Sequence, residues 1–152
     1  MEGKGRITGH TGLLALIGSP VGHSGSPAMY NYSFEKLGLD YAYVAFDIKV
    51  EEVKAALDAM RLFHMRGCNV TMPCKTEAAK YMDELSPAAR IIGAVNTIVN
   101  EDGKLIGHMT DGEGFVGNLR DHGIEIKGKK ITVAGGCLLY TSPSPRDRSL
   151  SR

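Results

Sequence analysis

The stretch "AVNTIVNEDGKLIGHM" (94–109) decides what kind of sheet this chain builds. Two apolar runs, 94–99 and 104–109, flank the four residues Asn-Glu-Asp-Gly. Asp-Gly between two apolar runs is a strong signal of a β-hairpin, because both residues tolerate the positive φ of a tight turn. We therefore expect two antiparallel strands at this place in the chain.

The residues before and after this hairpin predict strands that alternate with helices. Apolar or alternating runs followed by turn residues predict strands at 13–18, 41–48 and 67–73. Helical spacing predicts helices at 26–39, 51–63, 74–85 and 111–123, with a short one after Ser86-Pro87. Ser26 is the expected N-cap of the helix at 26–39, Pro27 its first residue and Gly38 its end. The alternation is typical of an α/β domain, and the hairpin makes its sheet mixed, with helices on both faces.

Composition limits the partners that this chain is expected to have. The 152 residues carry a formal net charge of +1 and are 43% hydrophobic, which suits one ordinary domain or one domain and the start of another. Such a weak charge gives no reason to expect binding to nucleic acid or to an anionic membrane. Three cysteines without zinc-type spacing, and no signal region or long apolar run, favour a metal-free protein of the cytoplasm. The oligomeric state stays open.

Two segments carry residues suited to bind an acid and to move a proton. In "GHSGSPAM" (22–29), the hydroxyls of Ser24 and Ser26 lie near an expected helix N-terminus, where they could hold a carboxylate. From the pattern alone, a turn residue and a helix cap are the favoured alternative. In "NVTMPCK" (69–75), Lys75 begins a helix, where the local field disfavours a cation, so it could serve as an acid or base. The alternative is a lysine that extends into solvent.

Two further segments place polar side chains where they need a partner. Asn96 of "GAVNT" (93–97) lies in an otherwise apolar strand, so its amide must meet a ligand or a neighbouring loop. Asp111 of "TDGEG" (110–114) lies between a strand and a helix, and could act in a site. It could also be a helix-capping residue, because Thr110 and Glu113 fit a capping box.

The segment "GEGFVG" (112–117) matches the dinucleotide fingerprint G-x-G-x-x-G, but the match is rejected here. The strand before it belongs to the expected hairpin, and its glycines fall inside a helical pattern. The acidic residue expected ~20 positions later is also missing from 130–133. The better candidate for the start of a cofactor domain is "ITVAGG" (131–136), a strand that runs into glycines.

Together and in this order, "IGSPVGHSGSPAMYN", "NVTMPCK", "GAVNT" and "TDGEG" resemble the substrate-binding motifs of the shikimate dehydrogenase family, over 12–136. Two longer segments, "MRGCNVTMPCK" (65–75) and "DELSPAARIIGAVNTIVNEDG" (83–103), look closer to the quinate/shikimate dehydrogenase branch of the family. Met109 departs from the pattern, because the family commonly has Asn before Thr-Asp-Gly.

The resemblance implies interconversion of shikimate and 3-dehydroshikimate with NADP or NAD. It implies that Ser24 and Ser26 bind the substrate carboxylate and that Thr71, Asn96 and Asp111 bind ring hydroxyls. It further implies that Lys75 is the catalytic acid/base, oriented by Asp111. The partner would be a small molecule, either shikimate or quinate.

The end of the chain departs from the rest. We expect a substrate-binding domain over 1–110, a connecting helix and loop over 111–128, and the first strand of a truncated Rossmann domain over 129–136. The Ser/Pro-rich 137–152 is expected to be a disordered, non-native tail, because "CLLYTSPSPRD" resembles translated sequencing-adapter DNA. Since hydride transfer depends on a held cofactor, we expect this chain to bind no NAD(P) well and to be inactive. The alternatives are a redox-inactive module that binds small polyhydroxy acids, and a chain that does not fold stably.

Overall fold

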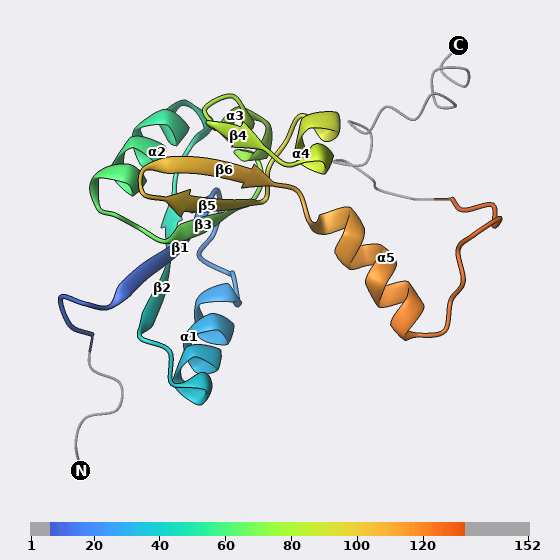
Figure 1. The fold of residues 1–152 in the computed structure, drawn as a ribbon, viewed down its shortest axis with the longest axis horizontal. Helices are drawn as coiled ribbons and strands as arrows, with labels where there is room; N and C mark the ends of the chain where they lie inside the picture. Colours follow the sequence, from blue (N-terminus) through green and yellow to red (C-terminus); the bar gives the residue numbers. More distant parts are fainter. Residues whose placement is uncertain (1–6, 133–152) are drawn as a thin grey trace.

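The computed structural model describes residues 7–132 as one mixed α/β unit (Figure 1). The strands are β1 (Gly12–Gly18), β2 (Tyr41–Asp47), β3 (Gly67–Val70), β4 (Glu84–Leu85), β5 (Thr97–Glu101) and β6 (Lys104–His108). The helices are α1 (Ser26–Leu37), α2 (Val53–Leu62), α3 (Lys75–Ala79), α4 (Pro87–Ile92) and α5 (Asp111–Asp121), with a 3₁₀ turn η1 at Val50–Glu52. None of these helices is both long enough and apolar enough to cross a membrane.

The six strands form one sheet in the order β2-β1-β3-β5-β6-β4. The pairs β2-β1, β1-β3 and β6-β4 are parallel, whereas β3-β5 and β5-β6 are antiparallel. The mixed sheet expected from the hairpin is therefore confirmed. In the turn of the hairpin, Asp102 and Gly103 have φ values of 52° and 95°, as a tight turn requires.

The two faces of the sheet contribute to two separate cores, because successive side chains of a strand point to opposite faces. On one face, Ala15 and Ile17 of β1 pack in a large cluster with Leu57 and Met60 of α2. On the other face, Leu16 packs with Tyr43 in a smaller cluster to which α1 contributes Tyr30 and Phe34. Helices therefore cover both faces, with α2 and α1 on opposite sides of β1.

The expected helix at 74–85 is wrong over its second half. Helix α3 ends at Ala79, and Glu84–Leu85 form β4 beside β6. The Asp83 N–H donates to the Leu105 carbonyl at 2.9 Å, and the Ser86 N–H donates to Gly107 at 2.9 Å. Pairing with a strand some 20 residues away overrides the local helical spacing.

Two strand ends also differ from expectation. Strand β3 ends at Val70 rather than at 73, and β5 begins at Thr97 rather than at 94. The Val95 N–H donates to the Lys75 carbonyl at 3.0 Å, so this part of the expected strand belongs to a connection that holds α3. Asn96 therefore lies just before a strand, not within one.

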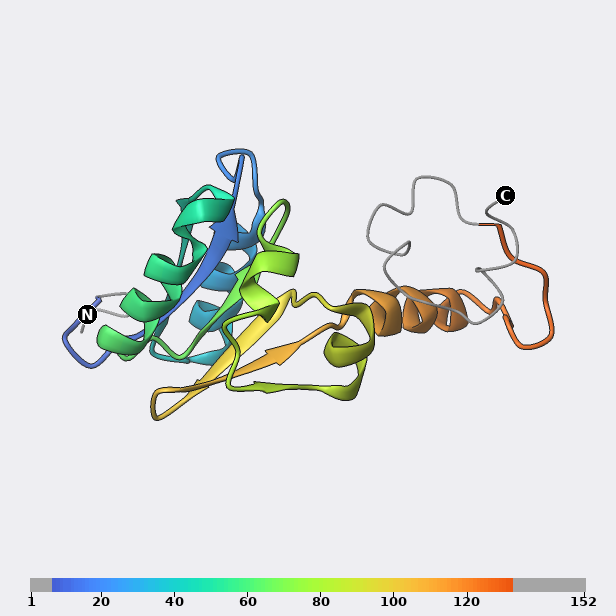
Figure 2. The ribbon, with the colours of Figure 1, turned by 90° about the horizontal axis from the view of Figure 1, so that it is seen from above.

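Helix α5 extends away from the sheet, as the two views of Figures 1 and 2 show. None of its residues is buried. Beyond it, the described part of the expected strand at 129–136 is not a strand, since 129–132 pair with none of the six strands. The remainder of that strand and the expected tail at 137–152 lie outside the described residues.

Candidate functional site

The candidate residues gather at one edge of the sheet because of its topology. Strands β1 and β3 are parallel, so both end at this edge, at Gly18 and Val70. Strand β5 is antiparallel to β3 and starts there, and β6 returns to it, with Thr97 paired to both Asn69 and His108. The segments that leave or enter this edge carry the two serines, Thr71, Lys75, Asn96 and Asp111.

Lys75 and Asp111 form an ion pair between α3 and α5. The Lys75 Nζ donates to Asp111 Oδ2 at 2.6 Å, and the two side chains are 12% and 50% exposed. This excludes the alternative that Lys75 simply extends into solvent. The carboxylate stabilises the ammonium group and offsets the unfavourable position of a cation at the start of a helix.

Asn96 connects this ion pair to Thr110. Its Nδ2 donates to the other Asp111 oxygen, Oδ1, at 2.6 Å and to Thr110 Oγ1 at 2.9 Å. Its Oδ1 accepts from the Thr110 N–H at 3.1 Å. Asp111 is thus not a plain capping residue, and the expected capping box is wrong, because Thr110 makes no side-chain cap bond. One Asp111 oxygen contacts Lys75 and the other contacts Asn96, so two residues orient the carboxylate.

Thr71 lies beside this cluster, directly after β3. Its N–H donates to the Ile17 carbonyl at 2.9 Å, which fixes it next to the end of β1. A Cβ on Gly18 would lie 2.5 Å from Thr71 Cγ2, and Gly18 has a φ of +148°. Only glycine fits here, so the close approach of Gly18 sets the place of the threonine.

The two serines lie at the start of α1, but Ser26 is not the N-cap that we expected. Gly25 is the N-cap, and Ser26 is the first residue of the helix. The reason is that the Ser24 Oγ accepts from the Ser26 N–H at 3.2 Å, a local turn that shifts the helix start by one residue. Among the hydrogen bonds of residues 7–132, none joins either serine directly to Lys75, Asn96 or Asp111.

The cysteines near the site are not suited to nucleophilic chemistry. Burial raises the pKa of the Cys68 thiol to about 12 and also raises the pKa of Cys74. Both thiols therefore stay protonated at neutral pH, whereas the thiolate is the reactive form. The chemistry of this edge depends on the lysine, the carboxylate and the short polar side chains.

The rejected dinucleotide match lies inside a helix, as predicted. Residues 112–117 belong to α5, and the Gly114 N–H donates to the Thr110 carbonyl at 2.9 Å. These glycines do not form a loop whose N–H groups could surround a phosphate. The described residues therefore do not fit a nicotinamide cofactor through this motif.

Sequence reasoning missed two residues at this edge. The sequence pattern marks Thr110 only as a cap, although its position next to Asp111 is a usable signal. Asp47, the last residue of β2, accepts from the Val21 N–H at 3.2 Å, in the loop that leads to the serines. No local pattern marked it, because the contact joins residues 26 positions apart.

The comparisons with known proteins point to one family. Residues 16–98 match the family described as "Shikimate dehydrogenase substrate binding domain". An NADP(+)-dependent shikimate dehydrogenase of Listeria monocytogenes is 53% identical over 130 residues, which are 86% of this chain and 45% of that protein. The chain thus spans less than half the length of the curated relatives it matches.

Solved structures agree with this match. A shikimate 5-dehydrogenase of Listeria monocytogenes, in complex with shikimate and NAD, is 50% identical with a TM-score of 0.84, covering 90% of this chain and 47% of that one. A shikimate 5-dehydrogenase of Thermus thermophilus in complex with shikimate is 42% identical with a TM-score of 0.73, covering 78% and 45%.

Proposed function

This chain belongs to the shikimate dehydrogenase family, as its substrate-binding domain, and on that premise we propose that its sheet edge binds a small polyhydroxy acid such as shikimate. The observation that carries the proposal is the cluster of Lys75, Asn96 and Asp111, joined by hydrogen bonds of 2.6 Å. Each residue comes from a different segment. Lys75 and Asp111 retain donor or acceptor capacity for a ligand, whereas both amide hydrogens of Asn96 are directed to Thr110 and Asp111.

The binding roles follow the resemblance of the motifs to those of the family, and the chemistry of the side chains agrees with them. Ser24 and Ser26 donate hydroxyl hydrogen bonds to the ligand carboxylate near the start of α1. Thr71, Asn96 and Asp111 bind the ring hydroxyls, for which a threonine hydroxyl, an amide and a carboxylate offer both donors and acceptors. Relatives of this family include structures that contain shikimate, which supports this choice of ligand.

Lys75 is the proposed acid/base. When a ring ketone is reduced, the Lys75 Nζ donates a proton to the carbonyl oxygen as a hydride reaches the carbon, and the lysine becomes neutral. In the reverse direction the neutral amine takes the hydroxyl proton. Asp111 holds the Nζ in place, because its Oδ2 lies 2.6 Å away while its Oδ1 is held by Asn96.

We place the nicotinamide site outside the described residues. The hydride would come from NADP or NAD, because one Listeria relative is named for NADP(+) and another was solved with NAD. The one fingerprint match within 7–132 is helical, so those residues are not proposed to hold the cofactor. We accordingly predict that the 152-residue chain does not turn over shikimate or quinate with either cofactor.

The test is a titration of the ¹⁵N-labelled chain with shikimate and, separately, with quinate. We expect saturable shifts of the amides near Ser24, Thr71 and Asn96. The double change of Ser24 and Ser26 to Ala should weaken binding about 10- to 100-fold, because hydrogen bonds to a charged group are lost. Ser33→Ala is the matched control, since Ser33 lies on the same helix and its hydroxyl contacts only the Met29 carbonyl. Absence of saturable binding would overturn the proposal.

A second candidate is a binding module without redox activity. It is favoured by the observation that the whole polar cluster lies within the described residues. Binding by this chain, combined with absence of turnover when the chain is joined to the cofactor-binding half of a relative, would support the module. Turnover by such a joined protein would support the dehydrogenase.

A further inference from the structure

The loop between β1 and α1, residues 19–25, carries Ser24 and leads into Ser26 at the start of α1, but few contacts hold this loop in place. The Ser19 N–H donates to the Met72 carbonyl at 3.0 Å, and Val21 packs into the smaller core with only 5% of its surface exposed. The Ser24 N–H donates to the Val21 carbonyl at 3.0 Å, which closes a turn inside the loop. The geometry of Ser24 therefore depends on how Val21 is held.

Asp47 contacts this loop from the end of β2. It is the strand partner of Gly18, directly before the loop. Its Oδ2 accepts from the Val21 N–H at 3.2 Å. The Ser19 hydroxyl and the Val21 N–H hold the pKa of Asp47 below its usual value. Within 7–132, no other side chain from outside residues 19–26 makes a hydrogen bond to residues 19–24.

We propose that Asp47 is a positioning residue that holds the loop through the Val21 N–H, so that Ser24 and Ser26 present their hydroxyls to the carboxylate of a ligand. The hydrogen bonds form a continuous path from Asp47 to the Val21 N–H, from the Val21 carbonyl to the Ser24 N–H, and from the Ser24 Oγ to the Ser26 N–H. The identity of the ligand rests on the proposed function; the order of the loop does not.

The sign of the charge gives this proposal a specific consequence. A carboxylate beside an anion-binding loop repels the anion, so the charge of Asp47 does not itself favour binding. The Asp47 side chain therefore contributes by accepting hydrogen bonds, which the side-chain oxygen of asparagine also accepts. Asp47→Asn should therefore keep the loop ordered, whereas Asp47→Ala should not.

The experiment compares Asp47→Ala, Asp47→Asn and the control Asp40→Ala in the full 152-residue chain. Asp40 lies just before β2 and accepts from the Thr11 hydroxyl at 2.7 Å, so its removal costs a similar contact at the other end of the strand. The first readout is amide hydrogen exchange of Val21 and Ser24. We expect exchange to be about 3- to 10-fold faster in Asp47→Ala, in line with the loss of one hydrogen bond, and unchanged in the other two.

The second readout uses two ligands, shikimate and its methyl ester, which lacks the carboxylate charge. Asp47→Ala should weaken shikimate binding about 3- to 10-fold, as for the loss of one hydrogen bond, and leave the ester nearly unaffected. An equal loss for both ligands, or unchanged exchange at Val21 and Ser24, would overturn the positioning role. If the unmodified chain binds neither ligand, the proposed function fails, and the exchange rates alone still decide the role of Asp47.

Discussion

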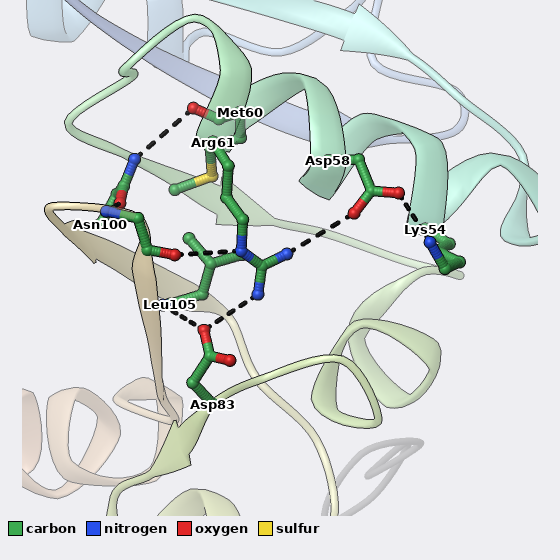
Figure 3. Close-up of polar contacts among 8 residues, drawn as sticks. Lys54, Asp58, Met60, Arg61, Asp83, Asn100 and Leu105 are labelled. Atoms are coloured by element: carbon green, nitrogen blue, oxygen red, sulfur yellow. Dashed lines mark hydrogen bonds and ion pairs between the residues drawn. The ribbon is translucent and has the colours of Figure 1, made fainter.

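Two ion-pair clusters lie at opposite ends of the hairpin β5-β6, and they differ in how many groups of the fold hold the cation. At the turn, Arg61 donates through Nε to the Gly103 carbonyl at 3.0 Å and through Nη2 to Asp83 at 2.9 Å, and its Nη1 lies 3.7 Å from Asp58 (Figure 3). At the other end, Lys75 meets one carboxylate, Asp111. We call the first cluster closed, because three groups of the fold hold its cation, and the second open, because one carboxylate holds its cation.

Residues beside Arg61 also form hydrogen bonds with backbone groups of several segments. The Asp83 Oδ2 accepts from the Leu105 N–H at 2.7 Å, and Asn100 donates to the Met65 carbonyl and accepts from the Gly103 N–H. This ties α2, β4 and the hairpin together. The lysine ammonium has three N–H donors, of which one is directed to Asp111, so two stay available. The comparison teaches that a cation held by one carboxylate is a better candidate for contacting a ligand than a cation held by three groups of the fold.

The largest effect should follow from removing the cation of the open cluster. In a protein that joins residues 1–132 to the cofactor-binding half of the Listeria relative, Lys75→Met should lower kcat about 10²- to 10⁴-fold, since the proton donor is lost. The control is Lys80→Met, because Lys80 forms only an exposed pair with Glu77. A kcat within about twofold of the parent, well below the range for a lost acid/base, would remove Lys75 from the mechanism.

Removing the cation of the closed cluster should affect stability instead. Arg61→Ala should lower the free energy of unfolding by about 1–2 kcal/mol, because its partners are partly exposed and the carbonyl of Gly103 loses a donor. Ligand affinity should stay unchanged. The measurement is urea unfolding, with Lys54→Ala as the control; this residue forms an exposed pair with Asp58 and should cost less than about 0.5 kcal/mol. Weakened ligand binding in Arg61→Ala would break the distinction between the clusters.

A smaller change should sharpen the description of the open cluster. Thr110→Val keeps the shape of the side chain but removes the hydroxyl that accepts from Asn96 at 2.9 Å. Asn96 should then be less well oriented, and shikimate affinity should fall about 3- to 10-fold, as for the loss of one hydrogen bond. Thr76→Val, an exposed position in α3, is the control. Equal affinity for parent and Thr110→Val in the same titration would show that Asn96 needs no help from Thr110.

The sequence predicted those parts of the fold whose causes are local. The Asp102-Gly103 turn, the end of α1 at Gly38 in the left-handed conformation, and the Ser86 cap of α4 all follow from the residue types present. Strand β4 could not be predicted in this way, because only pairing with β6 makes it a strand. The chemistry of the site was predicted as residue types, but its contacts were not. That Thr110 would orient Asn96, and that Asp47 would hold the serine loop, depends on segments that meet only after folding.

The smallest effect should appear in the acid dependence of stability, where the two regions can be compared directly. The Leu105 N–H and Arg61 hold the pKa of Asp83 below its usual value, and the contacts of Asp47 with Ser19 and Val21 lower its pKa as well. A lowered native pKa means that the stabilisation is complete above the pKa of the unfolded chain, about 3.9, and is lost as the pH falls through the native pKa. The free energy of unfolding should therefore decrease below about pH 4 in the parent chain, and less steeply in either Asp83→Asn or Asp47→Asn.

The change should be larger for Asp83→Asn, because Asp83 accepts a backbone N–H at 2.7 Å rather than 3.2 Å and also faces an arginine. Urea unfolding between pH 2.5 and pH 6, a range that spans about two units above the unfolded pKa, measures both slopes. Equal slopes in the parent and Asp83→Asn would mean that the closed cluster adds no charge-dependent stability, and that its hydrogen bonds alone distinguish it from the open one.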